Sequence, residues 1–408
     1  MPVEALQFVD SVPRWVVSKA LGGLWKGVFW SPLACLRYRQ VPEPTLPGPD
    51  WVKVKTRYSG ICGSDMNLIL LHDSPSTSPF ASFPFTIGHE NVGTVAEAGA
   101  HVTGFRVGDR VVVDPMLPCE VRGISPRCRL CERGDHSICE NFTRGNLSPG
   151  MLTGSCRDTG GGWSPYFLAH RSQLLHVPDN VTDEQAVLVD PFASSLHALM
   201  RHFPAPDQTS LVVGAGVIGL GVVAGLRALG HRGRIVVLAR HGFQADLARQ
   251  YGADEVVRTG PGYVNRMADA LGTRALKTMI GKPVLENGAD VVYECVGSSG
   301  SIDDALRFGG RGGKVVLVGL ASVPRSVDWS FIWLKELQVV GSFCYSTEEY
   351  RGARVRTYAV ALDLMARGEV DLSPLLTHRF RLREYRKAFQ TLTDKKNSRV
   401  VKAAFVFD

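Results

Sequence analysis

The sequence of 408 residues lacks an apolar run long enough to cross a membrane. The strongest candidate, residues 211–226 (LVVGAGVIGLGVVAGL), is shorter than the roughly 20 residues that a membrane-spanning helix needs, and glycines interrupt it. Dense basic runs are also missing, aromatic residues are not interleaved with lysine or arginine, and the net charge is a modest +7. We therefore expect neither a membrane span nor a nucleic-acid partner.

A secretion signal is lacking as well, because Glu4 and Asp10 precede the first apolar stretch and no convincing cleavage site follows it. Nine cysteines are present, and four of them crowd into residues 119–139. In a long chain this pattern is more typical of metal binding than of disulfides, so we expect a reducing, cytoplasmic setting. With 45% hydrophobic and 21% charged residues and 43 glycines, the composition indicates a globular α/β protein.

The character of the chain changes near its middle. Residues 34–190 carry short strands with alternating polarity, such as DWVKVKTRYSG, bounded by glycine and proline. From about residue 205, continuous apolar strands alternate with helical stretches, which predicts a doubly wound parallel sheet. Because the tail again contains a strand-like run, we assign residues 1–192 and 347–408 to a β-rich domain and residues 193–346 to the parallel-sheet domain.

An unusual segment, residues 11–33, places Trp15, Trp25 and Trp30 among basic residues. One interpretation is a helix that lies in a membrane interface. The other is a segment that packs on the body of the protein, at a pocket mouth or a subunit contact. We favour packing, because the charges do not segregate cleanly to one helical face.

A glycine-rich turn between a strand and a helix predicts a dinucleotide site. In VVGAGVIG, Gly214 permits a tight turn, Gly216 permits close approach of a pyrophosphate, and Gly219 permits close packing of helix and strand. The free N–H groups of the helix N-terminus then face the phosphates. The predicted cofactor-binding residues from this turn and from the later ECVG stretch are Gly214, Gly216, Val217, Ile218, Gly219 and Val296.

The end of the next strand decides between the two nicotinamide dinucleotides. An NAD site usually carries an acidic residue there, which binds the ribose hydroxyls. Here RIVVLAR ends in Ala239, Arg240 and His241, without a carboxylate. Because arginine can hold a 2′-phosphate and a carboxylate would repel it, we favour NADP(H), with NAD as the alternative.

Two groups of metal ligands are present. Cys119, Cys128, Cys131 and Cys139 lie in a polar, glycine-rich loop, where four thiolates suit a closed, tetrahedral structural zinc. The alternative, a buried quartet without metal, is disfavoured because the loop has little apolar core around it.

The second group comes from distant parts of the chain. Cys62 in GICGSD and His89 in GHE offer sulfur and nitrogen to a catalytic zinc, which needs about three protein ligands and an open position. Asp190 in LVDPFASS is the expected third ligand. Glu90 is expected as a fourth ligand or as a group just outside the ligand shell.

Two further residues beside these ligands have expected roles. Asp65 is expected to orient the His89 imidazole, and Ser64 to carry a proton away from the bound alcohol. A lone cysteine or histidine is more often an ordinary core residue. We disfavour a core role for Cys62 and His89 because all these residues occur together, upstream of a dinucleotide-binding pattern.

In this order, GICGSD, GHE, GDRV, the four-cysteine loop and GAGVIG resemble the zinc-dependent medium-chain alcohol and polyol dehydrogenases, over nearly all of residues 34–408. The resemblance implies a GroES-like β-rich catalytic domain interrupted by a Rossmann domain, with the active site in the cleft between them. It also implies one catalytic and one structural zinc, the ligands named above, and a homodimer or homotetramer. An acidic third ligand without a carboxylate at the second strand looks most like the NADP-dependent secondary-alcohol branch.

Four features depart from the family pattern. Cys119 and Cys128 are separated by EVRGISPR, where the family has two residues, so either the loop bulges outward or Cys119 is not a ligand. Asn67 stands where relatives often carry histidine, and Asp190 where many carry cysteine or glutamate. The segment 11–33 has no recognised counterpart.

The expected activity is hydride transfer between a small-molecule alcohol or carbonyl substrate and a nicotinamide cofactor. The alternatives are an NAD-dependent polyol or amino-alcohol dehydrogenase, a zinc-free enone or quinone reductase, and a non-catalytic dinucleotide-binding protein. The set formed by Cys62, His89 and Asp190 favours the zinc enzyme.

Overall fold

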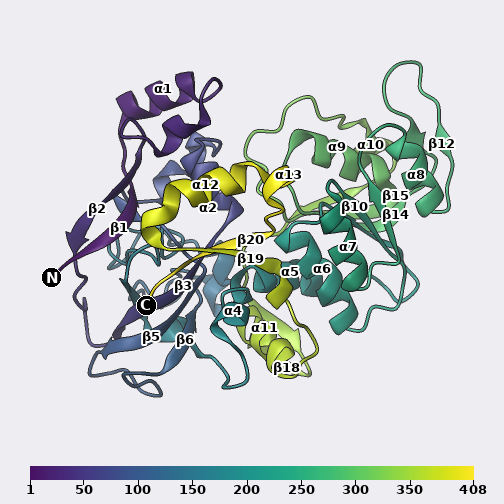
Figure 1. The fold of residues 1–408 in the computed structure, drawn as a ribbon. Helices are drawn as coiled ribbons and strands as arrows, with labels where there is room; N and C mark the ends of the chain where they lie inside the picture. Colours follow the sequence, from purple (N-terminus) through teal and green to yellow (C-terminus); the bar gives the residue numbers. More distant parts are fainter. The chain divides into compact units, whose positions relative to one another are not determined.

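The computed structural model describes residues 1–408, and the chain divides into two compact units (Figure 1). The first unit contains Met1–Asp190 and Asp371–Asp408, and the second contains Pro191–Val370. The first boundary falls close to the expected one. The second does not, because residues 347–370 belong to the parallel-sheet unit rather than to the β-rich unit.

A buried ion-pair cluster explains this correction. Glu348 on β17 (Thr347–Tyr350) lies 2.6 Å from Nδ1 of His197 and accepts a hydrogen bond from Nε of Arg201 at 3.0 Å. Both partners are on α5 (Val189–Arg201), the helix that leads into the second unit. The sequence does not show the distant contact that ties residues 347–350 to the second unit.

The first unit is built on two sheets. The larger sheet has the order β19-β20-β3-β5-β6-β8, with β7 also paired to β3, and the smaller one has the order β2-β1-β4. The long strand β3 alternates between buried and more exposed residues, as its sequence predicts. The strands are β1 Pro2–Phe8, β2 Leu36–Pro42, β3 Trp51–Ile61, β4 Phe85–Thr86, β5 Asn91–Ala98, β6 Arg110–Val113, β7 Tyr166–His170, β8 Leu174–His176, β19 Leu376–Phe380 and β20 Lys402–Val406.

Short helices connect these strands. The α-helices are α1 Val12–Leu21, α2 Gly63–Ile69, α3 Arg129–Glu132, α4 Asp183–Ala186, α12 Tyr385–Thr393 and α13 Lys395–Ser398. The 3₁₀ turns are η1 Lys26–Trp30, η2 Pro75–Phe80, η3 His136–Ile138, η4 Arg171–Gln173, η5 Ser373–Leu375 and η6 Leu382–Glu384. The C-terminal strand β20 pairs antiparallel with β3, and Ala403 faces Ile61. The start of β20 therefore lies beside the start of α2.

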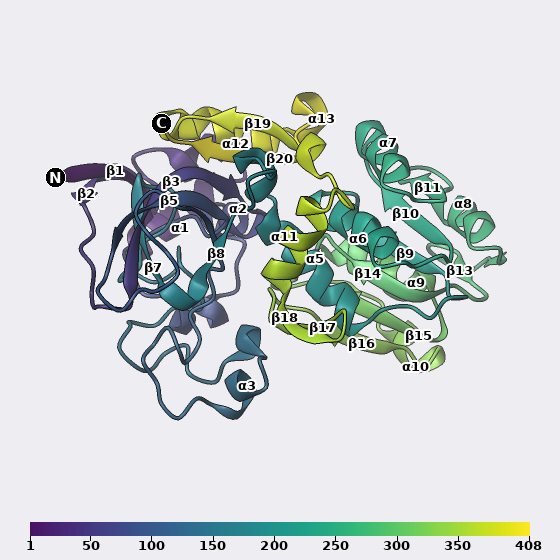
Figure 2. The same ribbon diagram turned by 90° about the horizontal axis from the view of Figure 1, so that it is seen from below.

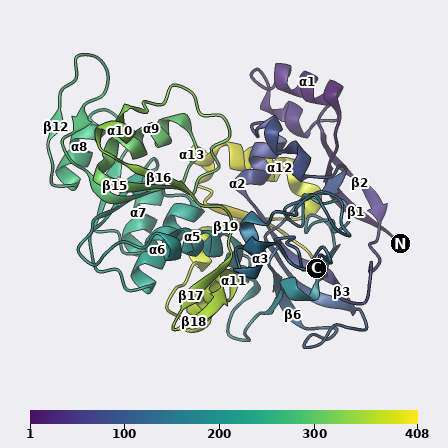
Figure 3. The ribbon, with the colours of Figure 1, turned by 180° about the vertical axis from the view of Figure 1, so that it is seen from behind.

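The second unit is a six-stranded parallel sheet with the order β11-β10-β9-β14-β15-β16. Apolar residues of α8, α9 and α10 form one core cluster on this sheet, whereas α5 packs against α6 (Figures 2 and 3). This architecture confirms the doubly wound sheet expected from the sequence.

The strands of the parallel sheet are β9 Ser210–Val213, β10 Ile235–Ala239, β11 Glu255–Arg258, β14 Ala289–Glu294, β15 Gly309–Leu317 and β16 Gln338–Gly341. Two short antiparallel pairs accompany it: β12 Ala275–Leu276 with β13 Val284–Leu285, and β17 with β18 Ala353–Arg356. Its helices after α5 are α6 Val217–Ala228, α7 Gly242–Gln250, α8 Tyr263–Ala270, α9 Ser299–Phe308, α10 Ser330–Leu334 and α11 Thr357–Ala366. None of the helices in the chain is both long and apolar enough to cross a bilayer.

The tryptophan-rich segment 11–33 divides into two parts. The turn η1 buries Val28, Phe29 and Trp30 in a core cluster of the first unit, as the packing interpretation predicts. The helix α1 does not follow that prediction, because Ser18 is its only buried residue. Packing therefore accounts for η1 but leaves the apolar side chains of α1 unexplained.

Candidate active site

The junction of β3 and α2 positions the first candidate ligand. Cys62 is the N-cap of α2, and its backbone N–H donates to Oδ2 of Asp65 at 2.8 Å. Acidic residues are favoured in the first turn of a helix because they accept the free N–H groups there. The GICGSD sequence therefore fixes the backbone of Cys62 and buries the Asp65 carboxylate at the same time.

His89 faces the same carboxylate. Its Nδ1 lies 3.4 Å from Oδ1 of Asp65, so one carboxylate reaches both Cys62 and His89. Burial alone would lower the pKa of His89, but the Asp65 carboxylate and the Cys62 side chain outweigh burial and raise this pKa well above its usual value. The electrostatic field that favours a proton on this imidazole equally favours a bound cation.

Glu90 completes the group. The ligand atoms of Cys62, His89 and Glu90 all lie within 4.8 Å of one another. A thiol, an imidazole and a carboxylate form a donor set that fits zinc. Glycine at position 60 makes room for the carboxylate, because a Cβ there would lie 1.8 Å from Oε2 of Glu90.

Lys402 on β20 is the functional residue that the sequence did not reveal. Its ammonium group forms an ion pair with Glu90, and the two side chains are only 2% and 1% exposed. Burial by itself lowers the pKa of Lys402, but the Glu90 carboxylate outweighs burial and raises it. The only signal in the sequence is a single charge inside the apolar run VVKAAFVF.

Asp190 is not part of the group formed by Cys62, His89 and Glu90. It lies in the first turn of α5, is buried, and contributes to the electrostatic environment of Lys402. Asp190, the expected third ligand, is near the site only through its charge, whereas the Glu90 carboxylate lies within 4.8 Å of the ligand atoms of Cys62 and His89. Ser64 is half-buried in the first turn of α2.

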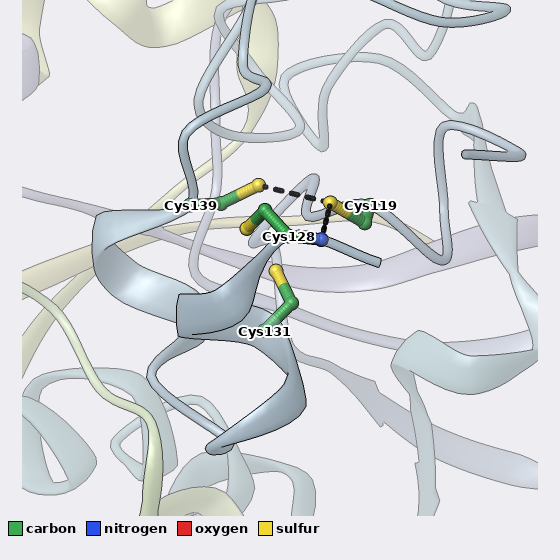
Figure 4. Close-up of side chains that lie close together, drawn as sticks. All are labelled: Cys119, Cys128, Cys131 and Cys139. Carbon is green, nitrogen blue, oxygen red and sulfur yellow. Dashed lines mark hydrogen bonds between the residues drawn. The ribbon is translucent and has the colours of Figure 1, made fainter. Parts of the chain in front are cut away.

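The cysteine quartet forms a second candidate metal centre (Figure 4). The sulfur atoms of Cys119, Cys128, Cys131 and Cys139 lie within 4.8 Å of one another. Those of Cys119 and Cys139 are 3.6 Å apart, close to the distance of about 3.8 Å that follows from tetrahedral Zn–S bonds. Cys119 therefore stands with the other three despite its unusual spacing.

Backbone and amide N–H groups point at these sulfur atoms. The N–H of Cys128 and the side-chain amide of Asn141 donate to Sγ of Cys119, at 3.3 and 3.2 Å. A hydrogen bond from Cys131 lowers the pKa of Cys139, to about 5, against the opposing effect of burial. Such donors stabilise thiolates, the form in which cysteine binds zinc. The loop therefore fits a structural zinc.

The inserted EVRGISPR stretch folds partly inward, around a buried arginine. The guanidinium of Arg122 is fully buried and donates to the backbone carbonyls of Leu117, Arg144, Leu147, Ser148 and Gly150. Ser125 and Arg127 remain on the surface. Only the second half of the insertion therefore bulges outward. The first half is held by the hydrogen bonds of Arg122 to the backbone.

The glycine-rich turn of the second unit has the geometry expected of a phosphate-binding loop. Gly214 has a φ of +99°, which favours glycine, and a Cβ at Gly219 would lie 1.8 Å from the carbonyl oxygen of Gly214. Gly216 is the N-cap of α6 and has nothing within 4 Å of the position of a Cβ. The N-terminus of α6 is therefore open to a ligand.

Val296 lies beside this turn. A Cβ at Gly214 would come within 2.2 Å of Cγ2 of Val296, so the predicted residues of two separate loops adjoin. Glu294, fully buried at the end of β14, accepts the N–H groups of Val296 and Gly297 at 3.0 Å and holds this loop. We did not anticipate this role of Glu294 from the sequence.

Two arginines lie at the carboxyl ends of the neighbouring strands β10 and β11. Ala239 ends β10 and pairs with Arg258, the last residue of β11. Arg240 follows Ala239 and is exposed, His241 caps α7, and the Arg258 guanidinium lies 3.9 Å from a Cβ position at Gly242. The carboxyl ends of these strands therefore present cations and no carboxylate.

Comparison with known proteins identifies relatives for both units. Residues 48–179 match the alcohol dehydrogenase GroES-like domain, and residues 217–358 match the zinc-binding dehydrogenase domain. The chain is 30% identical to an L-idonate 5-dehydrogenase of Vitis vinifera over 84% of its own length and 85% of that protein. It is 29% identical to a sorbitol dehydrogenase of Bacillus subtilis (strain 168), over 88% and 92%.

A solved structure shares the fold of this chain. A putative zinc-binding dehydrogenase from Sinorhizobium meliloti 1021, bound to NADP, matches the whole of both chains with a TM-score of 0.74 and 25% identity.

Proposed function

Because the chain belongs to the zinc-dependent medium-chain alcohol dehydrogenases, we propose that it moves a hydride between a small-molecule alcohol and its aldehyde or ketone. The observation that carries this proposal is the convergence of Cys62 with the adjacent residues His89 and Glu90. In such a site zinc polarises the oxygen of the alcohol or carbonyl, and a nicotinamide dinucleotide carries the hydride.

The residues around the ligands have distinct roles in this proposal. Asp65 holds the backbone of Cys62 and the imidazole of His89 in place, so both ligands are oriented before a substrate arrives. Ser64, in the first turn of α2, takes the proton of the alcohol towards solvent. Lys402 compensates the charge of Glu90, which keeps a carboxylate inside an apolar interior.

We favour NADP(H) as the cofactor. Arg240 and Arg258 can pair with a 2′-phosphate at the ends of β10 and β11, where no carboxylate repels it. The structural relative from Sinorhizobium meliloti, which binds NADP, supports this choice. Polyol oxidation is the natural first substrate class to test, since relatives are L-idonate and sorbitol dehydrogenases. A homodimer or homotetramer is the expected assembly.

A substrate panel measured in both directions, with NADPH and with NADH, tests the function. The protein is first analysed for zinc, because two ions per chain are expected for an enzyme and one for a protein with only the cysteine-bound ion. Turnover of alcohols or carbonyls by the two-zinc protein is the expected result. A chain that holds one zinc, binds dinucleotide and turns over no member of the panel would support the non-catalytic alternative instead.

A further inference from the structure

The helix α1 shows an inverted polarity. Its single buried residue is Ser18, which is 1% exposed, whereas Val12 and Val16 are 76% and 53% exposed. At 100° per residue, Val12, Val16 and Val17 share the side opposite Ser18. A surface helix normally buries such a stripe and exposes its polar residues.

The exposed apolar surface continues beyond the helix. Leu24 and Trp25, in the turn that follows α1, are 90% and 56% exposed. We call this surface the α1 patch; its residues are Val12, Val16, Val17, Leu21, Leu24 and Trp25. Figure 1 shows α1 at the periphery of the first unit, beyond the β1–β2 ribbon. All six patch residues lie within residues 12–25, and each is at least 38% exposed.

Specific contacts hold α1 in this orientation. Arg14 donates to the carbonyl of Pro32 at 2.5 Å, and Lys19 donates to the carbonyl of Leu71 at 2.6 Å. The turn η1 that follows is anchored in the core by Phe29 and Trp30. Two basic side chains of the helix and the turn after it are thus fastened to the protein, and these contacts hold α1 in the orientation that leaves its valines exposed.

The charges near the patch are mostly positive, and the exposed Asp10, two residues before Val12, is the acidic exception there. Residues 11–42 contain no aspartate or glutamate, and their basic residues are Arg14, Lys19, Lys26, Arg37 and Arg39. A symmetric contact between two α1 patches would bring these cations together, with only the Asp10 carboxylate of each copy to oppose them. An anionic lipid surface offers both the opposite charge and an apolar layer for valine, leucine and tryptophan.

We propose that the α1 patch docks this protein on the surface of an anionic lipid bilayer. With 10 residues, α1 is far too short to span the membrane, so it would lie in the plane of the interface with its apolar side inward. Trp25 and Lys26, adjacent in sequence, suit the boundary between acyl chains and headgroups.

Vesicle flotation of the full-length protein tests the proposal. Vesicles of phosphatidylcholine with phosphatidylglycerol are compared with vesicles of phosphatidylcholine alone, at low and at high salt. The test variant is the double substitution Val16→Glu with Leu24→Glu. The matched control is Val107→Glu with Ile280→Glu, which replaces two other exposed apolar side chains and changes the net charge equally.

The wild type and the control are expected to float with the anionic vesicles, and less at high salt. The test variant should partition at least about tenfold more weakly, because two inserted apolar side chains are lost. Equal flotation of the test variant and the wild type, or no flotation of the wild type, would overturn the proposal. Light scattering tests whether a second copy of the chain covers the patch instead. If the wild type does not bind vesicles and only the test variant loses an oligomer, the patch is a contact between copies.

Discussion

At the scale of single residues, one carboxylate organises the candidate active site. Asp65 reaches the backbone of Cys62 and the ring of His89 from a single helical turn. This part of the site could be predicted because the GICGSD sequence encodes it locally. Lys402 could not be predicted, because its partner Glu90 lies 312 residues earlier, just before β5, and nothing in the sequence links the two.

The buried pair of Lys402 and Glu90 leads to a stability prediction. Lys402→Met leaves the Glu90 carboxylate without its cation, so we expect a loss of about 3–5 kcal/mol in the free energy of unfolding, measured with urea. Lys402→Arg, which keeps the charge, should lose less. Adding Glu90→Gln to Lys402→Met should recover part of the loss. Identical unfolding curves for wild type and Lys402→Met would contradict the ion pair.

The two arginines at the ends of β10 and β11 lead to a cofactor prediction. Arg240→Ala and Arg258→Ala should each weaken NADPH binding by about 10- to 100-fold, the effect of losing a charge-assisted hydrogen bond, and should change NADH binding little. Fluorescence titration of both cofactors measures this. Arg234→Ala, at the opposite end of β10, is the control. An equal loss for both cofactors would remove the reason for choosing NADP.

At the scale of elements, the cysteine loop depends on a residue that binds no metal. The sequence predicts the quartet from spacing and composition, but it does not show how an extended insertion still brings Cys119 to the other three. Arg122 supplies the answer, since its guanidinium joins the insertion to five backbone carbonyls. An arginine in a loop is ordinarily read as exposed, which is why its role was missed.

Replacing this arginine should loosen the loop. Arg122→Met leaves buried carbonyls without donors, so we expect at least about 2 kcal/mol of destabilisation and faster release of one zinc to a chromogenic chelator. Arg127→Met, on the exposed half of the same insertion, should leave both measurements near the wild-type values. If the two variants behave alike, Arg122 does not hold the loop.

A buried lysine at the end of α10 leads to a pH prediction. Burial lowers the pKa of Lys335 from 10.5 to about 8, with Arg311 and Arg307 acting in the same direction, and its ammonium donates to the carbonyls of Arg307 and Gly309. Between pH 8 and 10.5 the unfolded chain binds more protons than the folded one. Stability should therefore rise with pH across this window, by up to about 3 kcal/mol.

Urea unfolding at several pH values measures this effect. The comparison variant is Lys335→Met, in which the rise should disappear while the contributions of other titrating groups remain. A rise of equal size in the wild type and in Lys335→Met would show that Lys335 is not its source.

At the scale of the whole molecule, the sequence predicted the two architectures better than the boundary between them. The parallel sheet follows from its apolar strands and the β-rich unit from alternation, which are local signals. The place of residues 347–370 depends on Glu348 finding His197 and Arg201 on α5, a tertiary contact. Similarly, α1 has local helix signals, but only the fold shows that its apolar side is left uncovered.

The two candidate metal centres should separate catalysis from stability in the intact protein. Cys62→Ser removes a ligand from a site that fits a catalytic ion, so turnover should be abolished, one zinc lost and the melting temperature little changed. Cys131→Ser removes a ligand of the closed quartet, whose metal contributes directly to folding. Here the other zinc should be lost and the melting temperature should fall by roughly 5–10 °C.

Zinc content, turnover and thermal unfolding are measured on the same preparations of both variants. Cys156→Ser serves as the control, because Cys156 is a buried thiol outside both groups and its loss should cost no zinc. Normal turnover by Cys62→Ser with both ions retained would refute the assignment of the first centre. An unchanged melting temperature after loss of zinc from Cys131→Ser would show that the quartet does not stabilise the first unit.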